Sequence, residues 1–135
     1  MKVKNIRKYL TEEQITERVK AMGEQISRDY GGETVYLICI LKGSIFFTCE
    51  LAKRITSPVE IDFMSVSSHG ADTSSSGVVK IGKDLDTTIE GKNVLVVEDI
   101  IDSGRTLSYL LQNLKTRNPK SLKLCTLLDK PDRRV

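Results

Sequence analysis

The chain has 135 residues, of which 39% are hydrophobic and 29% are charged, and its formal net charge is +3. This composition is typical of a soluble globular protein, and the length suits a single domain over residues 1–135 rather than two. No apolar run reaches the ~18 residues that span a bilayer, and the basic segment 1–10 lacks the apolar stretch of a secretory signal. We therefore expect a cytoplasmic protein that does not bind membranes.

The first predicted element is an amphipathic helix over residues 11–30. Thr11 and Gln14 have the spacing of a capping box at its start. Gly31 and Gly32 follow its last residue, where glycine commonly ends a helix. Its apolar face is predicted to comprise Ile15, Val19, Met22, Ile26 and Tyr30.

Strands and helices then alternate. Apolar runs predict strands at 34–41, 59–66, 78–81, 94–98 and 121–128, and helices at 44–55, with Ser44 as candidate cap, and at 105–117. The polar segment 67–77 is predicted to be a long flexible loop, of a length typical of active-site lids. This order predicts an α/β fold with an open, mostly parallel, Rossmann-like sheet flanked by helices. Ligands of such sheets bind beyond the carboxyl ends of the strands.

The sequence contains few cysteine and histidine residues that could bind a metal ion. Cys39, Cys49 and Cys125 lie far apart in apolar surroundings, so we interpret them as buried thiols. The single histidine, His69, has no ligand types beside it, which argues against a histidine-based metal site. The chain also lacks the interleaved basic and aromatic residues of nucleic-acid modules, and its basic N-terminus is interpreted as a solvated end.

The most informative stretch is VLVVEDIIDSGRT, residues 94–106, where a predicted strand ends in acids and passes into a helix. Free backbone N–H groups at a helix start bind anions, and a glycine lets an anion approach closely. Ser103, Gly104, Arg105 and Thr106 add two hydroxyls and a cation, so this turn is a candidate phosphate cradle. Acids are favourable at any helix start, but three at this spacing before S-G-x-T favour a binding site.

Three carboxylates beside a phosphate cradle suit a phosphorylated ribose. Glu98 and Asp99 can accept hydrogen bonds from vicinal sugar hydroxyls, or hold a hydrated Mg²⁺. Asp102 is the candidate general acid or base for the group attached to the sugar.

This stretch resembles the signature of type I phosphoribosyltransferases, and its form Glu-Asp-Ile-Ile-Asp-Ser-Gly resembles the bacterial hypoxanthine-guanine phosphoribosyltransferases. LKG at 41–43, the segment SSHG…SSSG with VVKIGKDLD, and LLDKP at 127–131 are similar to that family in order and spacing. The resemblance covers nearly the whole chain.

The resemblance implies roles around the ribose. Residues 103–106 would bind the 5′-phosphate, and Glu98 and Asp99 would contact the ribose hydroxyls and Mg²⁺. Asp102 would handle the proton at N7 of the purine. Lys42 and Gly43 would bind pyrophosphate through a turn whose peptide bond before the lysine is cis.

The resemblance also implies contacts to the base and a lid. Lys130 would contact the 6-oxygen that separates hypoxanthine and guanine from adenine, although from the residues alone a lysine after a strand is more often solvated. Ser68 and His69 would be contact residues of a lid that excludes water. The family more usually has tyrosine after that serine, so His69 implies a smaller aromatic cover.

Two further features limit the interpretation. Residues 77–83 fit the first seven positions of a P-loop, but Asp84 replaces the required hydroxyl and no helix is predicted to follow, so we reject a P-loop.

The family's chain continues past Val135 with a core strand, a purine-stacking ring and a hood, so we expect a C-terminally incomplete domain. Phe46, Phe47 and Phe63 are predicted in core elements and do not replace that ring.

The resulting expectation is a Mg²⁺-dependent purine-salvage enzyme. It would transfer 5-phosphoribosyl from phosphoribosyl pyrophosphate to N9 of hypoxanthine or guanine, giving IMP or GMP, and would form a homo-oligomer, a dimer or tetramer. Two alternatives stay open at this point: a non-catalytic nucleotide-binding regulator and an inactive fragment of such an enzyme. The residues do not determine the preference among hypoxanthine, guanine and xanthine.

Overall fold

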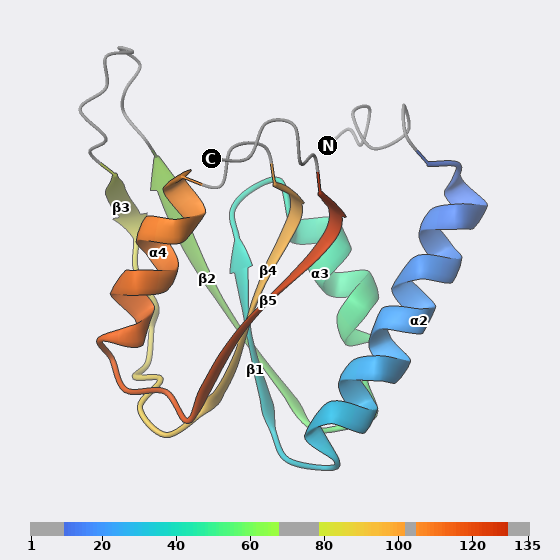
Figure 1. Cartoon of the computed structure of the whole chain (residues 1–135), viewed down its shortest axis with the longest axis horizontal. Coiled ribbons are helices and arrows are strands. Elements are labelled where there is room, and N and C mark those ends of the chain that lie inside the picture. The colour runs from blue at the N-terminus through green and yellow to red at the C-terminus, as the bar shows by residue number, and fades with distance from the viewer. Residues whose placement is uncertain (1–9, 68–78, 102–104, 130–135) are drawn as a thin grey trace.

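The computed structural model describes residues 10–67, 79–101 and 105–129. Within them, five strands form one sheet in the order β3-β2-β1-β4-β5, with helices packed on its faces (Figure 1). In chain order the elements are α2 (Glu12–Tyr30), β1 (Val35–Ile40), α3 (Ile45–Ala52), β2 (Val59–Ser67), β3 (Lys80–Lys83), β4 (Asn93–Ile101), α4 (Arg105–Lys115) and β5 (Ser121–Asp129).

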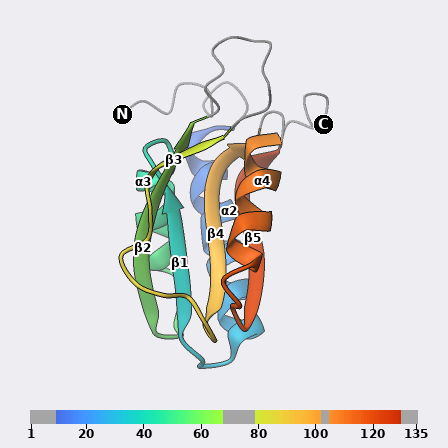
Figure 2. The same ribbon diagram turned by 90° about the vertical axis from the view of Figure 1, so that its left-hand side faces the viewer.

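The sheet is mostly parallel, as predicted. Strand β1 pairs in parallel with β2 and with β4, and β4 pairs in parallel with β5, whereas β3 joins the edge of β2 antiparallel. Figure 2 shows β2, β1, β4 and β5 side by side. From β1 the chain proceeds through α3 to β2 on one side, and from β4 it proceeds through α4 to β5 on the other. The strand order therefore reverses between β1 and β4, and in open α/β sheets the crevice at such a switch point binds ligands.

Two apolar layers enclose the sheet. Helices α2 and α3 cover one face and α4 covers the other (Figure 1). Every residue of β1 is buried, because this strand is central and covered on both faces. Successive residues alternate between the layers: Leu37, Leu95 and Val97 belong to the α2–α3 layer, and Ile38, Val94 and Val96 to the α4 layer.

Helix α2 has the predicted ends. The Thr11 side chain accepts a hydrogen bond from the Gln14 N–H at 3.0 Å, and the Gln14 side chain accepts one from the Thr11 N–H at 2.9 Å, which completes the capping box. Gly31 ends the helix with φ +54°, and its N–H donates to the Ser27 carbonyl at 3.0 Å. Val19, Ile26 and Tyr30 are buried on the predicted apolar face, so the 3.6-residue period indicated the packing correctly.

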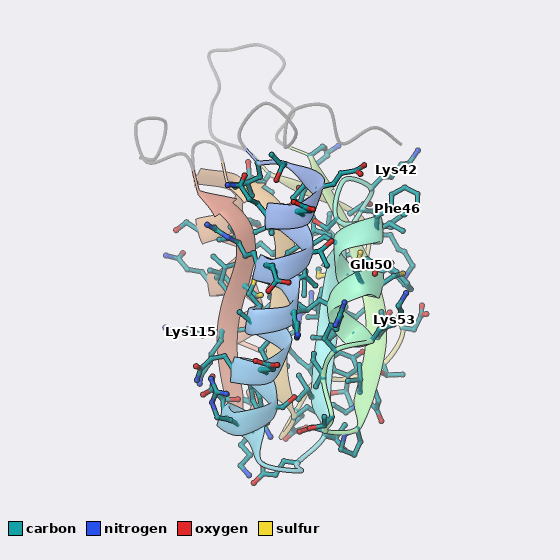
Figure 3. The ribbon with its side chains drawn as sticks, turned by 90° about the vertical axis from the view of Figure 1, so that its right-hand side faces the viewer. Lys42, Phe46, Glu50, Lys53 and Lys115 are labelled. Carbon is teal, nitrogen blue, oxygen red and sulfur yellow. The ribbon has the colours of Figure 1, made fainter. Side chains whose placement is uncertain are left out.

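Helix α3 differs from the prediction. It ends at Ala52, not near Ile55, and it packs on the sheet through its buried residues Phe47, Thr48 and Leu51. Cys49 is exposed, so its assignment as a buried thiol was wrong, whereas Cys39 and Cys125 are buried. Phe46 lies in this core helix, as predicted, but its ring is 53% exposed. Both lie on the outer side of a short helix, whose apolar sequence hides which face is buried. Figure 3 shows Lys42, Phe46, Glu50 and Lys53 along this side.

The rejected P-loop is absent from the described part of that segment. Residues 80–83 form the short strand β3, and the chain then runs through turns to β4 at Asn93 with no intervening helix. In the described residues, no helix is long and apolar enough to cross a membrane.

Candidate active site

The site predicted from the sequence lies where the carboxyl ends of β1 and β4 separate. Strand β1 ends at Ile40, and residues 41–44 form a turn that leads into α3. The Leu41–Lys42 peptide bond is cis, as the resemblance implied. Lys42 and Gly43 are exposed, so the backbone and ammonium group of this turn are accessible to a ligand.

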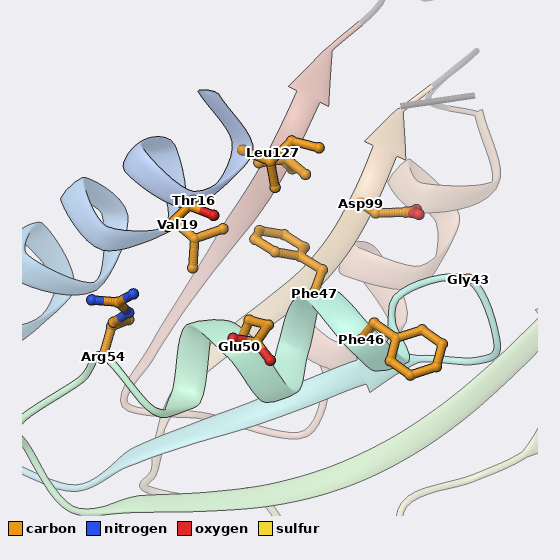
Figure 4. A pocket seen from close by; sticks show the side chains of 10 residues that line it. Thr16, Val19, Gly43, Phe46, Phe47, Glu50, Arg54, Asp99 and Leu127 are labelled. Atoms are coloured by element: carbon orange, nitrogen blue, oxygen red, sulfur yellow. The ribbon is translucent and has the colours of Figure 1, made fainter. Parts of the chain in front are cut away.

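Gly43 lies against the carboxylate of Asp99. A Cβ atom built on Gly43 would be 3.6 Å from Oδ1 and 3.7 Å from Oδ2 of Asp99. These two residues are 56 positions apart in the sequence, and the parallel pairing of β1 with β4 brings them together. Figure 4 shows Asp99 on β4 beside the Gly43 turn. The tertiary structure thus joins the predicted pyrophosphate turn to the predicted ribose-binding acid pair.

Glu98 is mostly withdrawn from solvent. Burial raises the pKa of Glu98 to about 7, although a hydrogen bond from Ser44 acts to lower it, and the neighbouring charge of Asp99 raises it further. The bond joins Ser44 Oγ, as donor, to Glu98 Oε1 at 2.9 Å. A hydroxyl donor or a cation brought to this carboxyl would favour its ionised form, which suits a residue that accepts from a sugar.

Ser44 is the site residue whose role the sequence analysis missed. It occupies the N-cap position of α3, but its side chain makes no bond to the helix. The hydroxyl instead bonds Glu98 and accepts the Asp99 N–H at 3.1 Å. One signal was available: the third helical position is Phe47, so the reciprocal partner of a capping box is missing.

The described residues on either side of the predicted phosphate cradle belong to a strand and a helix. Strand β4 continues past the acid pair to Ile101, three residues beyond the predicted end of the strand, and α4 begins at Arg105, where a helix start offers free N–H groups. Thr106 lies half-buried in the first turn of α4. Of the Arg105 side chain the structure describes nothing. The other predicted site residues fall outside the described residues and keep their roles as predictions: Ser68, His69, Asp102, Ser103, Gly104 and Lys130.

A hollow of about 130 Å³ lies on the α2–α3 face of the sheet. Asp99 and Gly43 form one end, Glu50 and Arg54 lie toward the other, and most of the wall between them is apolar (Figure 4). This wall is mostly apolar and includes Phe47, whereas the turn and the acid pair at the strand ends carry the polar groups that a phosphorylated sugar needs. We therefore assign the candidate site to the strand ends and not to this hollow.

Comparison with known proteins agrees with this fold. Residues 6–135 match the family described as the phosphoribosyl transferase domain. The chain belongs to this family. Among its members, the chain is similar to the hypoxanthine-guanine phosphoribosyltransferase of Mycobacterium bovis, with 54% identity over 129 residues, 91% of this chain. It is 50% identical to that of Streptococcus thermophilus over 133 residues, 98% of this chain and 74% of the relative.

Solved structures of phosphoribosyltransferases share the fold. The chain matches a hypoxanthine-guanine phosphoribosyltransferase from Bacillus anthracis with TM-score 0.85 and 50% identity, covering 93% of this chain and 73% of that one. It matches a hypoxanthine phosphoribosyltransferase from Staphylococcus aureus with TM-score 0.88 and 47% identity, covering 93% and 68%. The chain spans 64% of the length of the M. bovis relative.

The donor set suits the Mg²⁺ that the family implies. In the described ranges, no three histidine, cysteine, aspartate or glutamate side chains are grouped closely enough to hold a metal ion. Glu98 and Asp99 offer carboxylate oxygens, and Mg²⁺ commonly binds through one or two carboxylates together with water and substrate phosphates. Glu98 and Asp99 could therefore hold Mg²⁺ together with water and substrate phosphates.

Proposed function

We propose that this protein transfers a 5-phosphoribosyl group from phosphoribosyl pyrophosphate to N9 of hypoxanthine or guanine, with release of pyrophosphate, in purine salvage. The observation that carries the proposal is the contact between the Lys42–Gly43 turn and the Glu98–Asp99 pair at the sheet's switch point. Relatives that are named hypoxanthine-guanine phosphoribosyltransferase and are at least 50% identical to this chain support the choice of reaction.

Each group at the strand ends has a task in that reaction. The accessible backbone of Lys42 and Gly43, with the lysine ammonium, binds pyrophosphate oxygens. Asp99 and Glu98 accept hydrogen bonds from the ribose hydroxyls, and the start of α4 receives the 5′-phosphate. The donor is thereby held at both ends with its reacting carbon between them, so positioning contributes much of the acceleration.

Mg²⁺ is part of the proposal. Glu98 and Asp99 would hold it, directly or through the sugar hydroxyls and water. When bound, the cation neutralises charge on the pyrophosphate leaving group.

The remaining roles follow the family resemblance. We propose that Asp102 handles the proton at N7 of the purine, that Lys130 contacts its 6-oxygen, and that Ser68 and His69 belong to a lid. Ser103, Gly104, Arg105 and Thr106 complete the phosphate cradle.

The test is turnover by the 135-residue chain with phosphoribosyl pyrophosphate, Mg²⁺ and one of hypoxanthine, guanine or adenine. We expect IMP and GMP but no AMP. Asp99→Asn and Asp102→Asn should each slow product formation by about 100-fold, within the usual contribution of a proton-transfer or charge-binding group. Asp29→Asn, an exposed aspartate near the end of α2, is the matched control and should turn over normally.

Two results would contradict the proposal. A folded chain that forms nucleotide from adenine as readily as from the 6-oxopurines would overturn the substrate assignment. A folded chain that binds phosphoribosyl pyrophosphate yet forms no product from any base would overturn the assignment as an enzyme.

We also propose that the protein is a cytoplasmic homo-oligomer, a dimer or tetramer. Three free cysteines support a reducing compartment. The exposed ring of Phe46, beside Lys42 and Glu50 on the outer side of α3, supports self-association through that helix (Figure 3). Sedimentation of the wild type and of Phe46→Ser tests this: the wild type should be oligomeric and the variant should dissociate.

A further inference from the structure

We propose that Ser44 is a positioning residue, which joins the pyrophosphate turn to the ribose-binding acid pair through its hydroxyl. The inference rests on the function proposed above and adds a residue to it. Ser44 touches no substrate in this assignment and acts through Glu98 and Asp99.

The hydroxyl of Ser44 makes two bonds to neighbouring residues of β4. It donates to Oε1 of Glu98 at 2.9 Å and accepts the main-chain N–H of Asp99 at 3.1 Å. One atom therefore orients the side chain of the first acid and the main chain of the second. A hydroxyl provides one donor and two acceptor lone pairs, so both bonds can form at once.

The backbone of Ser44 is held independently of that hydroxyl. Its N–H donates to the Ile40 carbonyl at 3.3 Å, and its own carbonyl accepts the Thr48 N–H at 2.8 Å. The residue is 0% exposed. Since strand, helix and surrounding side chains fix its position, the hydroxyl is a rigid link and not a mobile surface group.

The link replaces strand pairing where the sheet opens. The register of β1 with β4 runs from Val35 opposite Asn93 to Cys39 opposite Val97, and β1 ends one residue later. Glu98 and Asp99 continue β4 past the last register pair, where β1 no longer supplies a strand partner. The Ser44 hydroxyl occupies that place, while on the other side Thr126 Oγ1 donates to the Asp99 carbonyl at 3.4 Å.

The Ser44 hydroxyl fixes the positions of Glu98 and Asp99. Without the hydroxyl, the partly buried Glu98 side chain loses a hydrogen-bond donor and the Asp99 amide loses an acceptor, so the positions of both relative to the Gly43 turn are less fixed. Phosphoribosyl pyrophosphate, which spans the turn and the acid pair, would then bind less well, because the two halves of its site no longer have a fixed separation. Neither bond of the hydroxyl is made to Asp102 or Lys130, the residues assigned to the base, so we expect affinity for the purine to be unaffected.

The experiment compares wild type, Ser44→Ala, Ser44→Thr and the matched control Ser57→Ala. Ser57 is also buried, with 5% exposure, and its hydroxyl accepts the Gly32 N–H near the opposite end of the sheet. Calorimetry measures binding of phosphoribosyl pyrophosphate with Mg²⁺, and steady-state kinetics measure KM for each substrate. Amide hydrogen exchange at Asp99 is followed without ligand.

We expect Ser44→Ala to bind the donor about tenfold more weakly, as suits the loss of a hydrogen bond to a charged group. KM for hypoxanthine should stay unchanged, and exchange at the Asp99 amide should accelerate. Ser44→Thr retains the hydroxyl and should recover most of the affinity. Ser57→Ala should bind like the wild type. In the Glu98→Leu background, which has no acceptor for the Ser44 hydroxyl at this position, Ser44→Ala should weaken binding by much less than tenfold, because the two residues act together.

The outcomes separate this inference from the proposed function. A wild type that does not bind phosphoribosyl pyrophosphate overturns the function and with it the inference. If the wild type binds and a folded Ser44→Ala binds equally well, only the inference is overturned. Equal weakening by Ser44→Ala in the wild-type and Glu98→Leu backgrounds, or equal weakening by Ser57→Ala, also overturns it, since the effect would then be one of general stability.

Discussion

The phenol of Tyr36 on β1 donates a hydrogen bond of 2.5 Å to the carboxylate of Asp62 on β2, which is 4% exposed. Asp62 also accepts the N–H groups of Phe63 at 2.8 Å and Asp86 at 2.9 Å. The Tyr36 oxygen lies 2.9 Å from the hydroxyl of Thr87. Tyr36 and Asp62 therefore bind the segment after β3, through Asp86 and Thr87, to strands β1 and β2.

This network predicts a cost for removing one hydroxyl. Tyr36→Phe leaves the ring in place but deprives a buried carboxylate of one donor, so the free energy of unfolding should fall by about 1–3 kcal/mol. Urea denaturation measures it. Tyr109→Phe is the control, since that ring is 44% exposed, and it should change stability by under about 0.5 kcal/mol. Equal losses in both variants would count against the network's role.

The same carboxylate predicts a loss of stability in acid. Burial acts to raise the pKa of Asp62, but hydrogen bonds from Tyr36, Phe63 and Asp86 outweigh it and the pKa is lowered. A group whose pKa is lower in the folded state stabilises the protein above its unfolded pKa, about 3.9, and this contribution is lost as pH falls through the folded pKa. Urea denaturation below pH 4 should show a shallower pH dependence in Asp62→Asn than in wild type. An unchanged slope would refute the assignment.

Tyr36 predicts the opposite behaviour in alkali. Burial, with the hydrogen bond to Asp62, raises the pKa of Tyr36 to about 12. A raised folded-state pKa contributes stability that is complete below the unfolded value, about 10, and is lost as pH rises toward the folded value. Tyrosinate absorbance should show a step near pH 12 that Tyr36→Phe lacks. A variant that retains this step would show that another tyrosine produces it.

Gly23 predicts a result that helix propensity alone would reverse. Alanine is better than glycine within a helix by about 1 kcal/mol. In α2, however, a Cβ atom on Gly23 would be 2.3 Å from Cβ and 2.8 Å from the carbonyl oxygen of Arg54. Gly23→Ala should therefore destabilise the protein by about 1–3 kcal/mol in chemical denaturation. Glu24→Ala, at the exposed next position, serves as control and should be neutral or slightly stabilising. A more stable Gly23→Ala would mean that α2 and Arg54 separate easily.

Helix α3 predicts contrasting effects of two apolar truncations. Leu51 is 0% exposed and Phe46 is 53% exposed, on opposite sides of one short helix. Leu51→Ala should cost about 2–5 kcal/mol, as in well-packed cores. Phe46→Ala should cost under about 1 kcal/mol at a protein concentration low enough to exclude self-association. Thermal and urea unfolding measure the stability of both variants. A large loss of stability for Phe46→Ala alone would reverse the assignment of the buried face.

Patterns local to the chain made much of the fold predictable. The Thr11–Gln14 capping box and the apolar spacing of α2 depend on neighbours within a few residues, and the structure confirms both. The continuous apolar run of β1 indicated a strand covered on both faces, and all its residues are buried. The family was likewise recognisable from one short stretch of sequence, whereas the predicted strand end at Glu98 was wrong, because β4 continues past the acid pair to Ile101.

Long-range contacts were less accessible. The eight residues of α3 are too apolar for a pattern to show which side is buried, so Cys49 was wrongly predicted to be buried. Ser44 has the sequence position of a helix cap. Only the structure, in which β4 lies beside the turn, showed that its hydroxyl forms hydrogen bonds with Glu98 and Asp99 instead.

The sequence by itself determined the elements, their order and the residue types that suit phosphoribosyl transfer, because periodicity, caps and motifs are encoded within short windows. Only the tertiary structure decided that the strand order reverses between β1 and β4, that Gly43 faces Asp99, and that one serine hydroxyl binds both acids. Such contacts join residues more than fifty positions apart, and their geometry depends on how the strands pair and where that pairing stops.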